Sequence, residues 1–111
     1  AAGELKHGTL ALVEEGFPVL AISTLSRLAQ KTENALQEVK SRGAFTILLS
    51  QSAEVFAESC AACKCRLPDV CERLMPVVAD IPLQYFACRM CLERGYNPDK
   101  PRNLAKSVTV E

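Results

Sequence analysis

The chain has 111 residues and carries 13 Lys and Arg against 13 Asp and Glu, so its formal net charge is zero with the single His neutral. This balance excludes binding to nucleic acid or to an anionic membrane surface that is driven by bulk charge. Hydrophobic residues make up 49% of the chain, which is typical of a packed soluble domain and too high for a disordered protein. No apolar run is long enough to span a membrane, and no basic leader precedes an apolar stretch, so we expect a cytoplasmic protein.

Two short apolar runs predict buried strands, over residues 17–23 and 45–50. Both are apolar on two faces and end at polar residues, which is typical of parallel strands, and we expect the first to be a central strand. Between them, apolar residues recur every three or four positions over residues 25–39. This spacing predicts an amphipathic helix.

Residues that favour the start and the end of a helix flank the predicted helix over residues 25–39. Ser23 or Thr24 can cap its first turn, and Gly43 can adopt the left-handed conformation that ends it. Strand, helix and strand in succession require a right-handed crossover between parallel strands. We therefore predict the α/β class, with an open parallel sheet and flanking helices.

Further along the chain we expect a short helix over 52–58, a short strand over 64–67 and a final helix over 71–94 that Gly95 ends. Pro76 and Pro82 fall inside the last helix, and each removes a backbone donor, which predicts a break or kink near one of them. Three strands make a thin sheet, so at least one edge is expected to pair with elements outside the chain. Because the chain opens without Met, we expect it to be a fragment of a longer protein.

Motifs at both ends of the chain resemble one family. The run GELKHG at residues 3–8 and the run PRNLAKSVTVE at residues 101–111 closely resemble the C-terminal isomerase domain of the glutamine:fructose-6-phosphate amidotransferases, and IPLQ at residues 81–84 resembles the last long helix of that family. The resemblance implies the later part of the second of two sugar isomerase (SIS) domains, over residues 1–95, followed by an active-site tail over residues 96–111. It further implies a homodimer that converts fructose 6-phosphate and glutamine-derived ammonia into glucosamine 6-phosphate.

The resemblance assigns roles to five residues. His7 is expected to assist opening of the sugar ring in the active site of the neighbouring subunit, since an imidazole can give and take a proton near neutral pH. Lys106 is expected to form a Schiff base with the open-chain ketose, which requires a neutral amine and therefore a pKa lowered by desolvation. Asn103, Leu104 and Ala105 are expected to line the substrate pocket. Spacing alone favours a surface His and a solvated Lys, so the resemblance carries these assignments.

Other parts of the family's active site lie upstream of GELKHG. They are the carboxylate base for proton transfer, the Ser/Thr-rich turn that holds the sugar phosphate, the first SIS domain and the glutaminase domain. We therefore expect this chain alone to be inactive. The alternative function is a non-catalytic SIS module that binds a sugar phosphate, but such a module has no use for a terminal Lys tail.

The sequence departs from the family at two further positions. Thr9 stands where Pro usually follows the His-Gly pair, which changes how the next helix starts. Asp80 stands just before Ile81, where family members carry small or neutral residues. If Asp80 is buried, it needs a hydrogen-bond partner.

The chain has six Cys, and two groups of them have the spacing of zinc or iron–sulfur ligands. One group is Cys60, Cys63 and Cys65, and the other is Cys88 and Cys91. The second group falls on the predicted last helix, where Cys packs as a small apolar residue. We therefore expect no metal, and we expect no other cofactor. Secreted disulfide scaffolds are loop-rich and poor in aliphatic core, unlike this chain, so we also expect reduced thiols.

Overall fold

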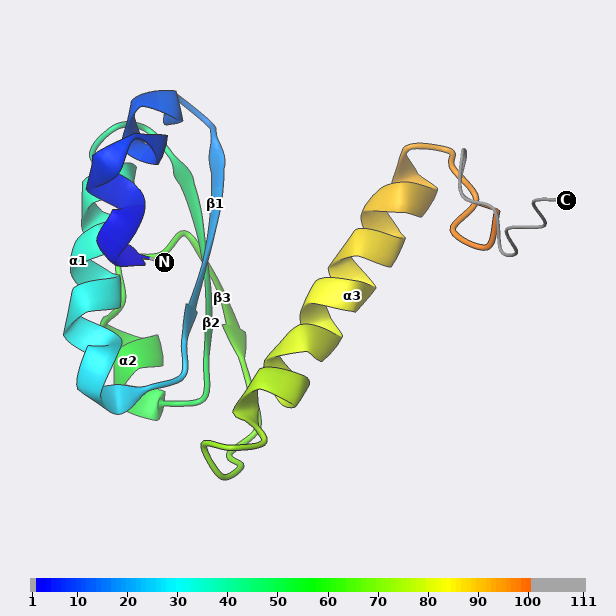
Figure 1. Ribbon diagram of the computed structural model, residues 1–111. Coiled ribbons are helices and arrows are strands. Elements are labelled where there is room, and N and C mark those ends of the chain that lie inside the picture. The colour runs from blue at the N-terminus through cyan, green and yellow to red at the C-terminus, as the bar shows by residue number, and fades with distance from the viewer. Residues whose placement is uncertain (1, 101–111) are drawn as a thin grey trace, which may run out of the picture. The chain divides into compact units, whose positions relative to one another are not determined.

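The computed structural model describes residues 2–100 (Figure 1). The chain divides into two compact units, residues 1–79 and residues 80–111. The first unit holds the whole sheet, and the second holds most of the last helix. In chain order the elements are the 3₁₀ turns η1 (Ala2–His7) and η2 (Thr9–Leu12), strand β1 (Pro18–Ser23), the 3₁₀ turn η3 (Ser26–Leu28), helix α1 (Ala29–Lys40), strand β2 (Phe45–Ser50), helix α2 (Ala53–Glu58), strand β3 (Cys63–Arg66) and helix α3 (Met75–Glu93).

The three strands form one parallel sheet in the order β1-β2-β3. Val19 pairs with Thr46, and Leu49 pairs with Cys65. The predicted α/β class is confirmed, but the prediction that the first strand is central is wrong. β2 is the central strand, and within residues 2–100 β1 has a neighbour on one side only. The apolar pattern of residues 17–23 indicates burial but does not determine strand order, which depends on the pairing of segments far apart in sequence.

Helices α1 and α2 lie on the same face of the sheet (Figure 1). Both connections run in the same direction along the sheet, and right-handed crossovers in one direction place their helices on one face. Leu36 of α1, Leu48 of β2 and Ala61 form the buried core there. Ala21 of β1 and Val55 of α2 pack against this cluster.

Gly43 ends α1 as predicted. Its φ of 87° is left-handed. Its N–H donates to the Lys40 carbonyl at 2.9 Å, and the N–H of Ala44 donates to the Val39 carbonyl at 3.2 Å. These two hydrogen bonds form a Schellman motif and satisfy carbonyls that the end of a helix leaves unpaired.

The predicted cap at the start of α1 is wrong, because the 3₁₀ turn η3 intervenes and the N-cap position Leu28 provides no side-chain hydrogen bond. The unpaired N–H groups of the first turn of α1 therefore follow η3 directly, and they do not follow Ser23 or Thr24. α2 is capped, since the hydroxyl oxygen of Ser52 accepts the N–H of Val55 at 3.3 Å. The short helix predicted over residues 52–58 is confirmed.

Substituting Gly43 by Ala is expected to destabilise the chain more than the same change at Gly16. Both glycines have a left-handed φ, which costs an Ala about 1–2 kcal/mol. A Cβ at Gly16 meets open space, whereas one at Gly43 lies 2.9 Å from the Cα of Glu15 and also meets its carboxylate. This overlap adds about 1–3 kcal/mol. Urea titration of both variants measures the difference, and equal losses would contradict the predicted overlap.

The helix α3 runs without interruption from Met75 to Glu93, so of the predicted break or kink the break is wrong, and the helix starts at Met75 instead of residue 71. Pro76 lies in the first turn, where no N–H is needed, and Pro82 removes a single hydrogen bond inside a helix of 19 residues. Gly95, with a φ of 74°, ends the helix as predicted. Asp80 is exposed and accepts a hydrogen bond from Gln84, so it does not need a buried partner.

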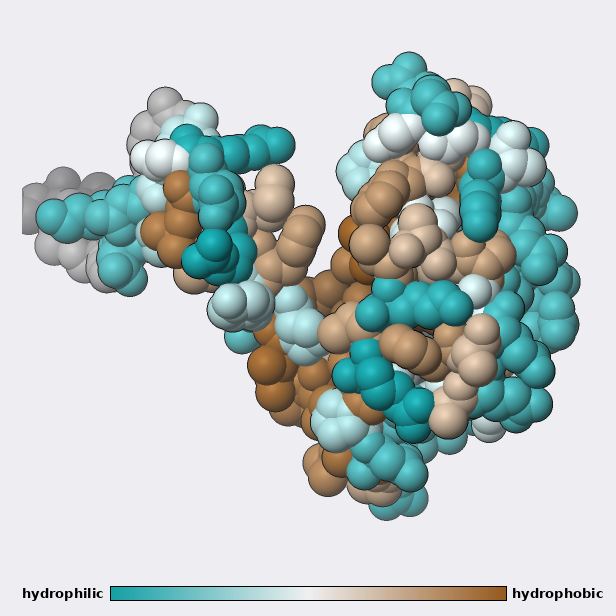
Figure 2. Space-filling model, turned by 180° about the vertical axis from the view of Figure 1, so that it is seen from behind, coloured by the Kyte–Doolittle hydropathy of each residue, from teal (hydrophilic) through white to brown (hydrophobic). Residues whose placement is uncertain are grey.

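The apolar residues of α3 are not confined to one side of the helix. Figure 2 shows large apolar side chains on the face that it presents. Ile81 is 61% exposed and Tyr85 is 68% exposed. A helix that is apolar all round is typical of the interior of a larger protein. Within residues 2–100, no helix is both long enough and apolar enough to cross a membrane.

Candidate functional site

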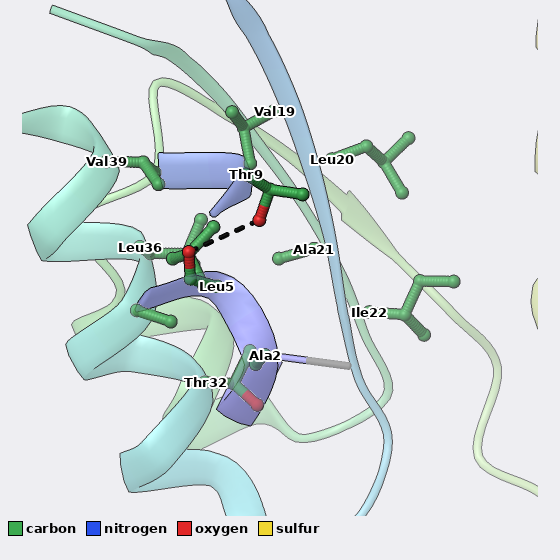
Figure 3. Close-up of a pocket in the computed structure, with 11 residues that line it drawn as sticks. Ala2, Leu5, Thr9, Val19, Leu20, Ala21, Ile22, Thr32, Leu36 and Val39 are labelled. Atoms are coloured by element: carbon green, nitrogen blue, oxygen red, sulfur yellow. Dashed lines mark hydrogen bonds between the residues drawn. The ribbon is translucent and has the colours of Figure 1, made fainter. Parts of the chain in front are cut away.

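His7 is the last residue of η1 and is exposed. Two contacts hold this turn. The hydroxyl of Thr9 donates to the Leu5 carbonyl at 3.2 Å (Figure 3), and the Lys6 ammonium lies 3.5 Å from a carboxylate oxygen of Glu38 on α1. The departure from the family at Thr9 therefore adds a local hydrogen bond to the turn that carries His7.

A cavity of about 400 Å³ lies between η1, β1 and α1 (Figure 3). Its lining is aliphatic, with Leu5 from η1, Val19 from β1 and Leu36 from α1, and two threonines add the only side-chain hydroxyls among its described lining residues. None of the described residues that line it is charged. An apolar cavity without a charged group offers nothing to neutralise a phosphate. His7 does not line this cavity.

A second cavity, of about 270 Å³, lies where the carboxyl ends of β1 and β2 lead into η3 and α2. Its lining includes Glu33, Glu54 and Glu58, and these carboxylates repel a phosphate dianion. Neither cavity suits a sugar phosphate within the described part of the chain.

A buried polar network joins the ends of β1 and β2, and sequence reasoning missed it. The hydroxyl of Ser50 donates to the Ser23 carbonyl at 2.8 Å and accepts the N–H of Ser52 at 3.2 Å. The amide nitrogen of Gln51 donates to the Thr24 carbonyl at 3.3 Å. The available signal was that both apolar strands end in a serine. The network fixes the loops that lead into η3 and α2.

Glu33 on α1 holds the loop between α2 and β3. Its carboxylate accepts the N–H of Cys60 at 2.8 Å, and the ammonium of Lys40 donates to the Cys60 carbonyl at 2.6 Å. Burial raises the pKa of Glu33, but hydrogen bonds from Cys60, Ser59 and Gln37 outweigh burial and lower that pKa overall. Burial, and then the hydrogen bond and charge of Glu33, raise the pKa of the Cys60 thiol. This thiol is therefore a poor nucleophile.

The lowered pKa of Glu33 predicts a dependence of stability on pH. A depressed folded-state pKa contributes stability that is present above the ordinary value of 4.5 and is lost as the pH falls through the folded-state value. We expect the urea midpoint of the wild-type chain to exceed that of Glu33→Gln at pH 7. The gap is expected to close progressively as the pH is lowered below 4.5. A gap of constant size would contradict the role of this charge.

All six cysteines are free thiols. Across residues 2–100, no group of three His, Cys, Asp or Glu side chains is placed to hold a metal ion. The prediction that Cys88 and Cys91 both pack as apolar residues is wrong for Cys88, which is exposed on α3, while Cys91 is half-buried. The apolar neighbours of Cys88 and Cys91 do not imply that both are buried. Because α3 is apolar on all sides, some of its apolar residues are exposed in this part of the chain.

The other candidate site residues lie in the tail. Asn103, Leu104, Ala105 and Lys106 fall outside the described residues. The structure therefore places His7 alone among the five residues predicted from the resemblance.

Comparisons with known proteins cover the whole chain. A glutamine–fructose-6-phosphate aminotransferase [isomerizing] of Corynebacterium efficiens is 44% identical over 115 aligned residues, and that of Thermococcus kodakarensis is 49% identical over 111. Each alignment covers 100% of this chain, but this chain spans only 18% of the relative's length.

The fold also matches a solved structure, the C-terminal domain of glucosamine-fructose-6-phosphate aminotransferase from Francisella tularensis. The two share 34% sequence identity with a TM-score of 0.81, over 89% of this chain and 28% of the other. The family model of the SIS domain matches residues 1–94. With sequence, fold and family model in agreement, the chain belongs to the SIS domain family.

Proposed function

We propose that this chain is the C-terminal part of the isomerase domain of a glutamine–fructose-6-phosphate aminotransferase. Residues 1–95 are the later part of its second SIS domain, and residues 96–111 are the active-site tail. The full-length protein is a cytoplasmic homodimer that acts on a sugar phosphate. The observation that carries the proposal is the 44–49% identity to these aminotransferases, over alignments that cover the entire chain.

The proposed chemistry takes two reacting groups from this chain, a proton shuttle and an amine. His7 moves the proton that opens the ring of fructose 6-phosphate. The neutral amine of Lys106 attacks the exposed C2 carbonyl, water leaves, and the resulting iminium withdraws electrons from C2. Ammonia released from glutamine then adds to C2 and displaces the amine of Lys106, which leaves an imine at C2 and a free lysine. A proton moves from C1 to C2 on a carboxylate base that the preceding part of the full-length protein supplies, and glucosamine 6-phosphate results. Asn103, Leu104 and Ala105 line the pocket around the sugar.

The described part of the chain supports a shared site. His7 is exposed at the end of a turn that the Lys6–Glu38 ion pair joins to α1 and that the Thr9 hydroxyl closes onto the Leu5 carbonyl. Neither of the two cavities described above suits a phosphate. A site that is completed by other parts of the protein accounts for both observations, and we therefore propose that this chain alone does not catalyse the reaction.

Chemical trapping tests the proposal. Treating the full-length protein with fructose 6-phosphate and borohydride is expected to reduce the iminium and attach the sugar irreversibly to Lys106. Peptide mass spectrometry locates the adduct. Lys106→Arg serves as the matched control and should remain unmodified. Labelling at another lysine would contradict the role of Lys106. Binding of the sugar phosphate without any adduct would favour the non-catalytic sugar-phosphate-binding module instead.

A further inference from the structure

The position of the His7 ring depends on the backbone that carries it. His7 is exposed at the end of η1, and no residue of η1 is fully buried. Within residues 2–100, no hydrogen bond or ion pair joins the His7 ring to another residue. A general acid or base acts only within hydrogen-bond reach of the proton that it moves. The backbone of η1 therefore has to be fixed for this ring to meet a substrate atom.

Packing beneath η1 is incomplete. Leu5 is half-buried and lines the cavity of about 400 Å³ that lies between η1, β1 and α1 (Figure 3). Protein interiors are normally close-packed, and a hollow of this size deprives the side chains that line it of contacts on one side. Apolar contacts alone therefore do not fix η1.

Thr9 closes the turn that carries His7. Its hydroxyl donates to the Leu5 carbonyl at 3.2 Å (Figure 3), so the hydrogen bond spans residues 6–8. Gly8 lies inside this span, and glycine has the fewest steric limits on its backbone. The hydrogen bond therefore restrains the segment around His7 where the backbone itself restricts it least.

Glu38 joins the same turn to α1. One of its carboxylate oxygens lies 3.5 Å from the Lys6 ammonium, and the other lies 3.7 Å from the guanidinium of Arg42. The Glu38 side chain is 25% exposed, so water screens this carboxylate only in part. Glu38 therefore provides a charged anchor on a helix for the residue just before His7.

We infer that Thr9 and Glu38 are positioning residues for His7, the first by closing its turn and the second by joining that turn to α1. The inference rests on the proposed function, because it requires His7 to move the proton that opens the sugar ring. Displacement of a reacting group from its productive geometry slows the step that it serves. Loss of either contact therefore slows ring opening and leaves the later steps unchanged.

Two substrates separate ring opening from the later steps in the full-length protein. Fructose 6-phosphate closes its ring when the hydroxyl on C5 adds to the C2 carbonyl, so 5-deoxyfructose 6-phosphate stays in the open-chain form. His7→Asn is expected to lower kcat/KM for fructose 6-phosphate at least about 100-fold and to retain most of it for the deoxy analogue. Equal losses on both substrates would contradict ring opening by His7, and the inference would fail together with that role.

Thr9→Val keeps the shape of the side chain and removes its hydroxyl. It is expected to lower kcat/KM for fructose 6-phosphate about 5–10-fold, the effect of one hydrogen bond, and to leave the deoxy analogue nearly unaffected. Thr9→Ser retains the hydroxyl and serves as the matched control, with the wild-type ratio of the two substrates. If His7→Asn shows the selective loss and Thr9→Val does not, the inference is overturned while the role of His7 stands.

A double-mutant cycle tests the link to α1. Glu38→Gln and Lys6→Met are each expected to lower kcat/KM for fructose 6-phosphate, relative to that for the deoxy analogue, by about 2–5-fold. The double variant is expected to lose no more than either single variant, because the pair is already broken. Glu72→Gln breaks another exposed ion pair, with Arg27, and is expected to leave the ratio unchanged. Additive losses, or equal losses for Glu72→Gln and Glu38→Gln, would overturn the role of Glu38.

Discussion

Heterodimers that combine one His7→Asn subunit with one Lys106→Arg subunit are expected to recover about half of the wild-type activity of the full-length enzyme. Each substitution alone is expected to lower the activity of the homodimer at least about 100-fold, because in the proposed mechanism it removes the proton shuttle or the amine that forms the iminium. If His7 enters the site of the neighbouring subunit, the mixed dimer contains one site with both groups intact. Co-expression with two different affinity tags isolates this species for assay.

A reciprocal heterodimer provides the control. One subunit carries both substitutions and the other carries neither, so the total number of changes is the same. With a shared site, each of its two sites lacks one group, and this dimer is expected to be inactive. Half activity here, together with an inactive mixed dimer, would place His7 and Lys106 of one chain in the same site and would contradict the shared arrangement.

Substituting Leu48 by Ala is expected to destabilise the 111-residue chain by about 2–5 kcal/mol. Leu48 is 0% exposed at the centre of β2, and it contacts the cluster of Leu36 and Ala61 between the sheet and the helices. Truncation leaves a cavity that two neighbouring strands prevent from collapsing. A small domain has only a few kcal/mol of net stability, so this change is large enough to unfold much of the population.

Leu12 provides the matched control, since it is also a leucine but is 68% exposed in η2. Leu12→Ala is expected to change the free energy of unfolding by less than about 0.5 kcal/mol. Urea titration of both variants, followed by circular dichroism, measures the difference. Similar losses at the two positions would contradict the assignment of the core to the α1 face of the sheet.

The strands and helices were largely predictable, because each depends on a local pattern. The apolar run over residues 45–50, the helical period before Gly43 and the serine at Ser52 each determine their element within a few residues. The start of α1 and the continuity of α3 were not. The first depends on the 3₁₀ turn η3, which has no distinctive composition, and the second on a helix tolerating Pro82 at the loss of one hydrogen bond.

The central position expected for β1 failed for a different reason. An apolar run predicts that a strand is buried, whereas strand order depends on which segments pair, and the run carries no information about that. In the candidate site, too, local features were predictable and contacts between distant residues were not. His7 was identified from a motif and lies at an exposed turn. The contact of Lys6 with Glu38 and the network around Ser50 depend on residues far apart in sequence, which a pattern along the chain does not reveal.

The strand order β1-β2-β3 repeats the order in which the strands are synthesised. As the chain leaves the ribosome, each new strand pairs with the one made just before it, and no strand has to be inserted between two that are already paired. Pairing each new strand then closes a loop that contains only the helix between it and the previous strand. Because this loop is short, the loss of chain entropy on pairing is small. The sheet can therefore grow during translation from β1 toward β3, where Lys64 and Arg66 disfavour the addition of a further strand.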